Sequence, residues 1–180
     1  KKKRGYRKVR VQKRASAGES IETRPGKIES RETFGHWEMD TVKGKKKVTK
    51  SCLLVLTERK TRDEIVVKLP DQRAASVVGA LDKLETCYGS LFPELFRTIT
   101  VDNGVEFSDC AGMEQSIRGG RRTKLYYCHP YSSWERGSNE NNNRLIRRHI
   151  PKGEDIDKYT DGKIKEIEEW MNGYPRRLLG

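Results

Sequence analysis

The sequence predicts a mixed α/β domain built on a five-stranded sheet flanked by helices. Two observations favour this fold class. Three strand-like runs come first, separated by turn-forming residues, and two further runs follow, alternating with segments of helical spacing. Apolar residues make up 33% of the 180 residues and charged residues 36%, which is polar for a globular chain but compatible with one ordinary domain.

The first three strands are expected to form an antiparallel meander. HWEMDTVKG ends in a glycine turn at Gly44, KSCLLVLTERKT is a short and strongly apolar run, and DEIVVKLP is stopped by Pro70. Gly44 and the polar stretch ERKTRDE are typical of the turns between such strands.

Helices and strands alternate in the rest of the chain. Apolar residues recur with helical spacing in DQRAASVVGALDKLETCYGSL, where Asp71 can cap the helix and Gly89 can end it. FRTITVDNG is a β-branched strand, DCAGMEQSIRGG a short helix, and RRTKLYYCHP a strand that Pro130 stops. Two helices, 138–149 and 161–172, complete the chain. The later strands are expected to join the sheet in parallel through helices.

The basic residues are concentrated at the start of the chain. Lys1 to Arg14 carry nine basic side chains and no acid, and residues 1–31 supply +9 of the formal net charge of +12. Because this segment is poor in large apolar residues, residues 1–33 are predicted to be a basic arm and linker, and residues 34–180 the folded domain. The arm residues expected to bind nucleic acid are Lys1, Lys2, Lys3, Arg4, Arg7 and Lys8.

The composition leaves three readings of the charge open. A strongly basic chain favours nucleic acid or an anionic membrane surface as its partner. It can also be merely a soluble basic protein. No apolar run approaches the roughly 18 residues of a membrane span, and no strongly amphipathic basic helix with bulky apolar residues is visible. The four cysteines lack CxxC spacing, so they are interpreted as reduced cytosolic thiols. Since the chain starts with Lys1 and stops at Gly180, we expect a piece of a longer protein.

Two aspartates lie where strands could bring them together. Asp40 lies in the first strand, on the face that alternation also gives to His36 and Glu38. Asp102 ends the fourth strand, directly before Asn103-Gly104. Either acid can be read as ordinary: a strand-end carboxylate facing solvent, or Asp-Asn-Gly turn chemistry. If the first and fourth strands are neighbours, however, both acids converge at one rim of the sheet, where α/β proteins bind ligands.

A third acid lies in the stretch HPYSSWERGSNENNNRLIRRHIPKG. If a helix runs from about residue 138 to 149, then Glu140, Asn143, Arg144 and Arg147 share one face. Such a face suits an acid beside a phosphate backbone that amides and guanidinium groups grip. It can also be a solvated helix with casual ion pairs. Glu135 lies upstream in a loop, off that face.

Three acids without a cysteine or histidine cluster indicate a hard, oxygen-seeking cation. Asp40, Asp102 and Glu140 would hold Mg²⁺ (or Mn²⁺), with two ions expected. Two such ions about 3.5–4 Å apart can activate a water or a 3′-hydroxyl and stabilise the leaving oxygen of a phosphodiester. The chemistry expected is phosphoryl transfer on nucleic acid without a covalent protein intermediate.

Three motifs in order, WEMDTVKG, VDNGVEF and HPYSSWERGSNENNNRLIRRHIPKG, resemble the DDE transposases of the IS-thirty family, which carry the integrase catalytic core. The resemblance covers roughly Phe34 to Gly180 and maps the family's acids onto Asp40, Asp102 and Glu140. One departure is a longer interval between Asp102 and Glu140, around SIRGGRRT.

The resemblance implies an RNase H-like fold, metal-dependent cleavage at transposon ends and strand transfer into target DNA. It also implies a homo-oligomer assembled on double-stranded DNA, in the bacterial cytoplasm at the nucleoid. The family's upstream helix-turn-helix region is absent from this sequence. The alternatives are a nuclease of the same fold that does not join strands, and a non-catalytic DNA-binding remnant.

Overall fold

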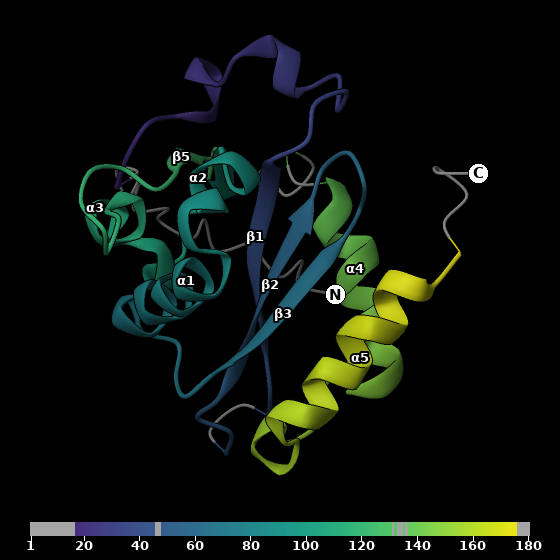
Figure 1. Ribbon diagram of the computed structural model, residues 1–180. Helices are drawn as coiled ribbons and strands as arrows, with labels where there is room; N and C mark the ends of the chain where they lie inside the picture. Colours follow the sequence, from purple (N-terminus) through teal and green to yellow (C-terminus); the bar gives the residue numbers. More distant parts are fainter. Residues whose placement is uncertain (1–16, 46–47, 131, 133–134, 136, 176–180) are drawn as a thin grey trace, which may run out of the picture.

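The computed structural model describes residues 17–45, 48–130, 132, 135 and 137–175. Its centre is a five-stranded sheet of order β3-β2-β1-β4-β5 (Figure 1). The strands are β1 (His36–Lys43), β2 (Cys52–Glu58), β3 (Glu64–Leu69), β4 (Thr98–Val101) and β5 (Lys124–Tyr127). The first three are antiparallel neighbours, and β4 and β5 join the edge of β1 in parallel. The predicted mixed sheet is confirmed.

Helices cover both faces of the sheet (Figure 1). The helices α1 (Ala74–Tyr88), α2 (Phe92–Leu95) and α3 (Cys110–Glu114) lie on one face, and α4 (Gly137–His149) and α5 (Asp161–Gly173) on the other. Gly89 ends α1 as predicted, with a φ of +62°. Asp71 is not the residue that caps α1, since Arg73 holds that position. Its carboxylate instead accepts hydrogen bonds from the Arg73 amide and the Ser76 hydroxyl.

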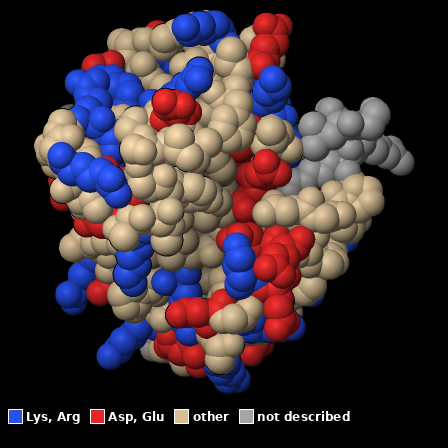
Figure 2. Space-filling model, in the orientation of Figure 1, with Lys and Arg blue, Asp and Glu red and all other residues tan. Residues whose placement is uncertain are grey.

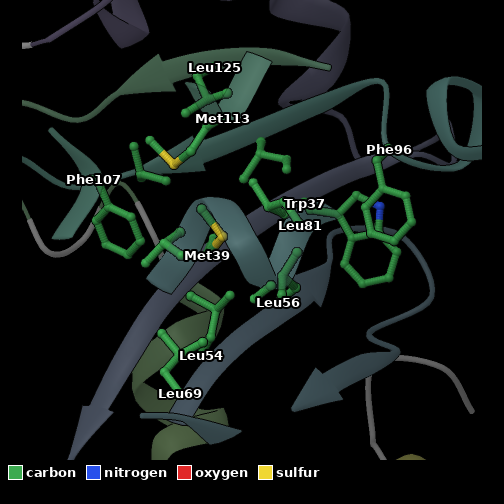
Figure 3. Packing of buried hydrophobic residues seen from close by; sticks show 14 of the residues in the cluster. Trp37, Met39, Leu54, Leu56, Leu69, Leu81, Phe96, Phe107, Met113 and Leu125 are labelled. Atoms are coloured by element: carbon green, nitrogen blue, oxygen red, sulfur yellow. The ribbon is translucent and has the colours of Figure 1, made fainter. Parts of the chain in front are cut away.

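Two apolar layers result, one on each side of the sheet. Figure 3 shows the larger layer, in which Trp37 and Met39 of β1 pack with Leu81 of α1 and Phe96. The smaller layer packs β-strand residues such as Val42 beneath α4 and α5. Every residue of β2 is buried because both layers cover it. Full burial of each leucine in such a strand contributes roughly 1.5–3 kcal/mol.

The segment 17–33 packs against the sheet, although its composition grouped it with the basic arm. It contains two short 3-10 helices, η1 (Ile21–Thr23) and η2 (Gly26–Ile28), and the purple ribbon of Figure 1 crosses the end of the sheet. Ile28 is buried, and Ser20 forms a parallel bridge with Tyr127 of β5. The folded unit therefore begins earlier than residue 34. The arm residues Lys1, Lys2, Lys3, Arg4, Arg7 and Lys8 lie outside the described residues.

In Figure 2 basic side chains are spread over much of the visible face, whereas acidic side chains gather near α5. Within the described part of the chain, no helix has the length and apolar character needed to cross a membrane. All four cysteines are free thiols.

Candidate active site on β1, β4 and α4

The parallel pairing of β1 and β4 brings Asp40 and Asp102 to the same edge. In this ladder Glu38 lies opposite Thr100. Asp40 and Asp102 each follow two residues later, so both belong to the sheet face that α4 and α5 cover. The two aspartates are half-buried. The first and fourth strands are neighbours, which is the condition under which the two acids were expected to converge.

Hydrogen bonds fix both carboxylates. Oδ1 of Asp40 accepts the Thr41 amide at 2.8 Å, and Oδ1 of Asp102 accepts the Gly104 amide at 2.8 Å. A Cβ atom at Gly104 would lie 2.9 Å from Oδ1 of Asp102 and 2.7 Å from Oε2 of Glu106. The Asp-Asn-Gly sequence is thus a turn, as its composition suggests, and it is also the turn that holds Asp102 at this edge.

Helix α4 is joined to this edge by two of its asparagines. Asn142 is buried and donates a hydrogen bond through Nδ2 to the Thr57 hydroxyl of β2 at 2.8 Å. Asn143 donates through Nδ2 to Oδ2 of Asp40 at 3.2 Å. Buried Ile146 fixes the same side of the helix against the smaller apolar layer. Two of the three consecutive asparagines, unfavourable for a helix by propensity, are therefore explained by tertiary hydrogen bonds.

Glu140 lies in α4, one turn before Asn143 and Arg144. The structure describes its backbone but not its side chain, so its role as a third metal ligand stays a prediction. Arg144 is exposed, as a phosphate contact requires.

Arg147 has a different environment from the one expected of a phosphate contact. Its guanidinium donates to the Lys43 carbonyl at 2.9 Å and to the carbonyls of Ile150 and Pro151 at 3.4 Å. Burial lowers the pKa of Arg147. In this structure Arg147 ties the end of α4 to the end of β1.

Glu106 is a buried acid of this region that the sequence motifs alone did not single out. Its Oε1 accepts hydrogen bonds from the Thr41 hydroxyl at 2.6 Å and from Nε2 of Gln72 at 2.7 Å. Burial raises the pKa of Glu106, but the hydrogen bonds from Thr41, its own backbone and Gln72, together with nearby Lys43, leave it below the ordinary value. Its position in the VDNGVEF motif, directly before the core residue Phe107, is the sequence feature that could have indicated a buried acid.

Glu135 is engaged with His129 and organises the loop before α4. Its two carboxylate oxygens face His129, one at 2.7 Å from Nδ1 and the other accepting the backbone amide at 2.9 Å. Nε2 of His129 lies 3.0 Å from Oε1 of Glu22 in η1. The hydrogen bond to Glu135, followed by that to Glu22, raises the pKa of His129.

The donor set fits a hard cation. Asp40 and Asp102 supply carboxylate oxygens, and Oδ1 of Asn143 is a buried oxygen without a hydrogen-bond partner beside Asp40. Oxygen donors of this kind suit Mg²⁺. Among the side chains that the structure describes, which exclude that of Glu140, no group of three acids, histidines or cysteines could hold a metal ion.

A mixed sheet of this order, with one acid within β1 and another directly after β4, defines an α/β protein compatible with the RNase H-like fold of integrase cores. Known proteins narrow this class. The chain is 40% identical over 164 residues to the transposase for insertion sequence element IS4351 of Bacteroides fragilis, covering 89% of this chain and 46% of that protein. It is also 40% identical over 161 residues to the transposase for IS1086 of Cupriavidus metallidurans, covering 89% and 44%.

The transposase InsI for insertion sequence element IS30A of Escherichia coli is 37% identical over 163 residues, which cover 90% of this chain and 40% of that protein. No protein-family model matches the chain. The relationship predicted from the motifs is confirmed: over most of its length the chain is a relative of insertion-sequence transposases, those of the IS30 elements among them. It spans less than half the length of these three relatives.

Proposed function

We propose that this chain is the catalytic core of a DNA transposase that cuts transposon ends and transfers the strands into target DNA. The single observation that carries the proposal is the parallel pairing of β1 and β4, whose register puts Asp40 and Asp102 on the same face of neighbouring strands. The similarity to transposases of insertion sequences supports it. Asp40, Asp102 and Glu140 are the proposed ligands of two Mg²⁺ or Mn²⁺ ions.

When bound, such ions would activate a water or a 3′-hydroxyl and stabilise the leaving oxygen of the phosphodiester. The chain itself orients the site. Asn143 holds Asp40 through its amide, and the Gly104 turn holds Asp102. Thr41 connects this edge to Glu106, whose buried carboxylate fixes the Thr41 hydroxyl behind the acids. Hydrogen bonds to the groups around a metal site keep the ligand oxygens in place.

The proposed substrate is double-stranded DNA, as transposon end and as target. Arg144, together with the basic residues of the arm, would contact the phosphate backbone, which positions the duplex without reading its sequence. The proposed active assembly is a homo-oligomer formed on DNA.

The test is cleavage of a labelled transposon-end duplex, followed by joining of its 3′ end to a plasmid in the presence of Mg²⁺. Asp40→Asn and Asp102→Asn keep the side-chain shape but remove the charge, so both should lose both activities. Asp63→Asn is the matched control, because Asp63 is an exposed acid in the turn between β2 and β3. Cleavage without a joined product would favour the nuclease. DNA binding without cleavage by the unchanged protein would favour the non-catalytic remnant.

A further inference from the structure

A surface cavity of about 390 Å³ lies where the 17–33 segment meets the residues that follow β2. It is lined by Ile21, Arg24, Glu29, Arg31, Arg59 and Glu135. We call it the arginine pocket, since three of its six residues are arginines. Arg31 lines it from a left-handed backbone conformation with φ of +58°, which is unusual for a residue other than glycine.

Two of these arginines are buried and incompletely satisfied. The side chains of Arg24 and Arg59 are each 2% exposed, and the Nε atom of each is buried without a hydrogen-bond partner. Nη1 of Arg24 donates to the Thr100 hydroxyl at 2.8 Å, and Nη1 of Arg59 donates to the fully buried Glu38 at 2.5 Å. Buried charged groups normally have their donors satisfied, so the two Nε atoms indicate capacity for a further acceptor.

One exposed carboxylate bridges the two guanidinium groups. Oε1 of Glu29 contacts Nη2 of Arg24, and Oε2 contacts Nη2 of Arg59 at 3.2 Å. The Glu29 side chain is 59% exposed, so it enters this arginine pair from the solvent side. A bidentate anion between two guanidinium groups is also the arrangement in which arginines bind phosphate.

The charges of the pocket depend on Glu29. Glu135 directs both carboxylate oxygens at His129. Glu29 is the one carboxylate in ion-pair contact with Arg24 among the residues that the structure describes. If Glu29 swung into solvent, Arg24 would lose the anion in contact with it and keep only the attraction of Glu38 and Glu135, a costly change for a buried cation. A phosphodiester carries one negative charge and could replace Glu29 without changing the charge of the pocket.

The pocket lies on the same sheet face as the acids. Arg59 contacts Glu38, and Arg24 contacts Thr100, and these two residues face each other across β1 and β4. One two-residue step along these strands, about 6.7 Å, leads to Asp40 and Asp102. Phosphates follow each other along a DNA strand by about 3.4 Å of helix axis. A strand held at the acids would therefore present one of its next backbone phosphates toward the pocket.

We propose that the arginine pocket is a backbone-phosphate site of the DNA strand held at Asp40 and Asp102, and that Glu29 occupies it until DNA displaces the carboxylate. The pocket thereby adds a phosphate contact to those expected of residues 1–14, on the same sheet face as the acids. This inference rests on the proposed function, because it takes DNA as the substrate.

The first test compares two glutamates of the same segment. Glu29→Gln should tighten binding of a labelled duplex of arbitrary sequence by about two- to fivefold, the range in which partly exposed ion pairs act. Glu32→Gln makes the same change in net charge at an exposed residue that does not line the pocket, and it should have little effect. Fluorescence anisotropy of the 180-residue chain measures both. Equal affinity of the two variants would overturn the proposal.

The second test observes the pocket directly. In the ¹⁵N-labelled chain, the Nε–H resonances of Arg24 and Arg59 should shift as the duplex is added, and in Glu29→Gln they should shift at lower DNA concentration. DNA binding with both resonances unchanged would overturn the pocket and leave the transposase proposal intact. If Asp40→Asn cleaved DNA at the wild-type rate, the transposase mechanism would be overturned. The comparison of DNA affinities would still test the proposal for the arginine pocket.

Discussion

Nδ2 of Asn143 donates a hydrogen bond to Oδ2 of Asp40 at 3.2 Å, and this bond joins α4 to the acid on β1. The two residues are 103 positions apart in the sequence. Since Glu140 lies one turn earlier in the same helix, the bond sets the position of the α4 backbone relative to Asp40. The arrangement accounts for an asparagine at this position better than helix propensity does.

Asn143→Ala should therefore lower the cleavage rate by about 10- to 100-fold, the usual effect of losing a hydrogen-bond partner of a metal-ligating group. Asn141→Ala is the matched control, because Asn141 is exposed on the same helix. Cleavage of a transposon-end duplex is the measurement, with circular dichroism to confirm the fold. Equal rates for the two variants would contradict the role given to the Asn143–Asp40 bond.

Asn142→Ala should act on stability. Loss of its bond to Thr57 leaves a buried hydroxyl without that partner, which costs about 1–3 kcal/mol. Urea denaturation would measure the loss, and Asn141→Ala again serves as the control. A variant as stable as the wild type would show that the bond does not hold α4 on the sheet.

The basic arm should add non-specific affinity for DNA. Deleting residues 1–14 removes nine positive charges, so binding should weaken and its dependence on salt should flatten. Each phosphate that the arm neutralises in the intact chain contributes about 0.9 to the slope of log affinity against log salt concentration. An unchanged slope after the deletion would rule out the arm as a source of phosphate contacts.

Arg147→Ala should raise the DNA concentration needed for cleavage and leave the dependence on metal concentration unchanged. The structure adds a reason, because Arg147 ties the end of α4 to Lys43 of β1, and loss of this tie loosens the helix that carries Arg144. Titrations of DNA and of Mg²⁺ separate the two effects. A shift in the metal titration alone would contradict the prediction.

His129 should make stability depend on pH. Its pKa is raised above the usual 6.5 by Glu135 first and then Glu22. A raised folded-state pKa means that the stabilisation is fully present below about pH 6.5 and is lost as pH rises through the folded-state pKa. Urea denaturation of the wild type from acidic to mildly alkaline pH should show this loss, and His129→Gln should remove it. If the free energy of unfolding changed with pH in the same way in the wild type and in His129→Gln, the role given to His129 would be refuted.

Much of the sheet could be predicted because each strand is a short apolar run bounded by turn residues, and such patterns are visible within a few neighbouring positions of the sequence. The contacts of the 17–33 segment could not, because they are long-range: Arg24 reaches Thr100, 76 residues away, and only Ile28 is a buried apolar residue of that segment. Glu106 was missed for the same reason, since its partners Thr41 and Gln72 lie 65 and 34 residues upstream. The neighbouring strands that carry Asp40 and Asp102 could be predicted because their apolar runs are visible in the sequence, and the role of the two acids as metal ligands stays a prediction.

We propose that Glu140, rather than Glu135, completes the acid set with Asp40 and Asp102. Glu135 is engaged with His129 in the loop before α4, whereas Glu140 lies within α4 one turn before the residue that holds Asp40. Replacing a carboxylate with an amide keeps the shape and removes the charge that divalent ions require.

The most direct test is cleavage and joining of a transposon-end duplex with Mg²⁺ by Glu140→Gln and Glu135→Gln in the full-length protein. Glu140→Gln should lose both activities by several orders of magnitude while it still binds DNA, because the proposed ions stabilise the entering and leaving oxygens. Glu135→Gln should retain most activity, with a modest loss from the altered contact to His129. An inactive Glu135→Gln beside an active Glu140→Gln would contradict the assignment of the third acid.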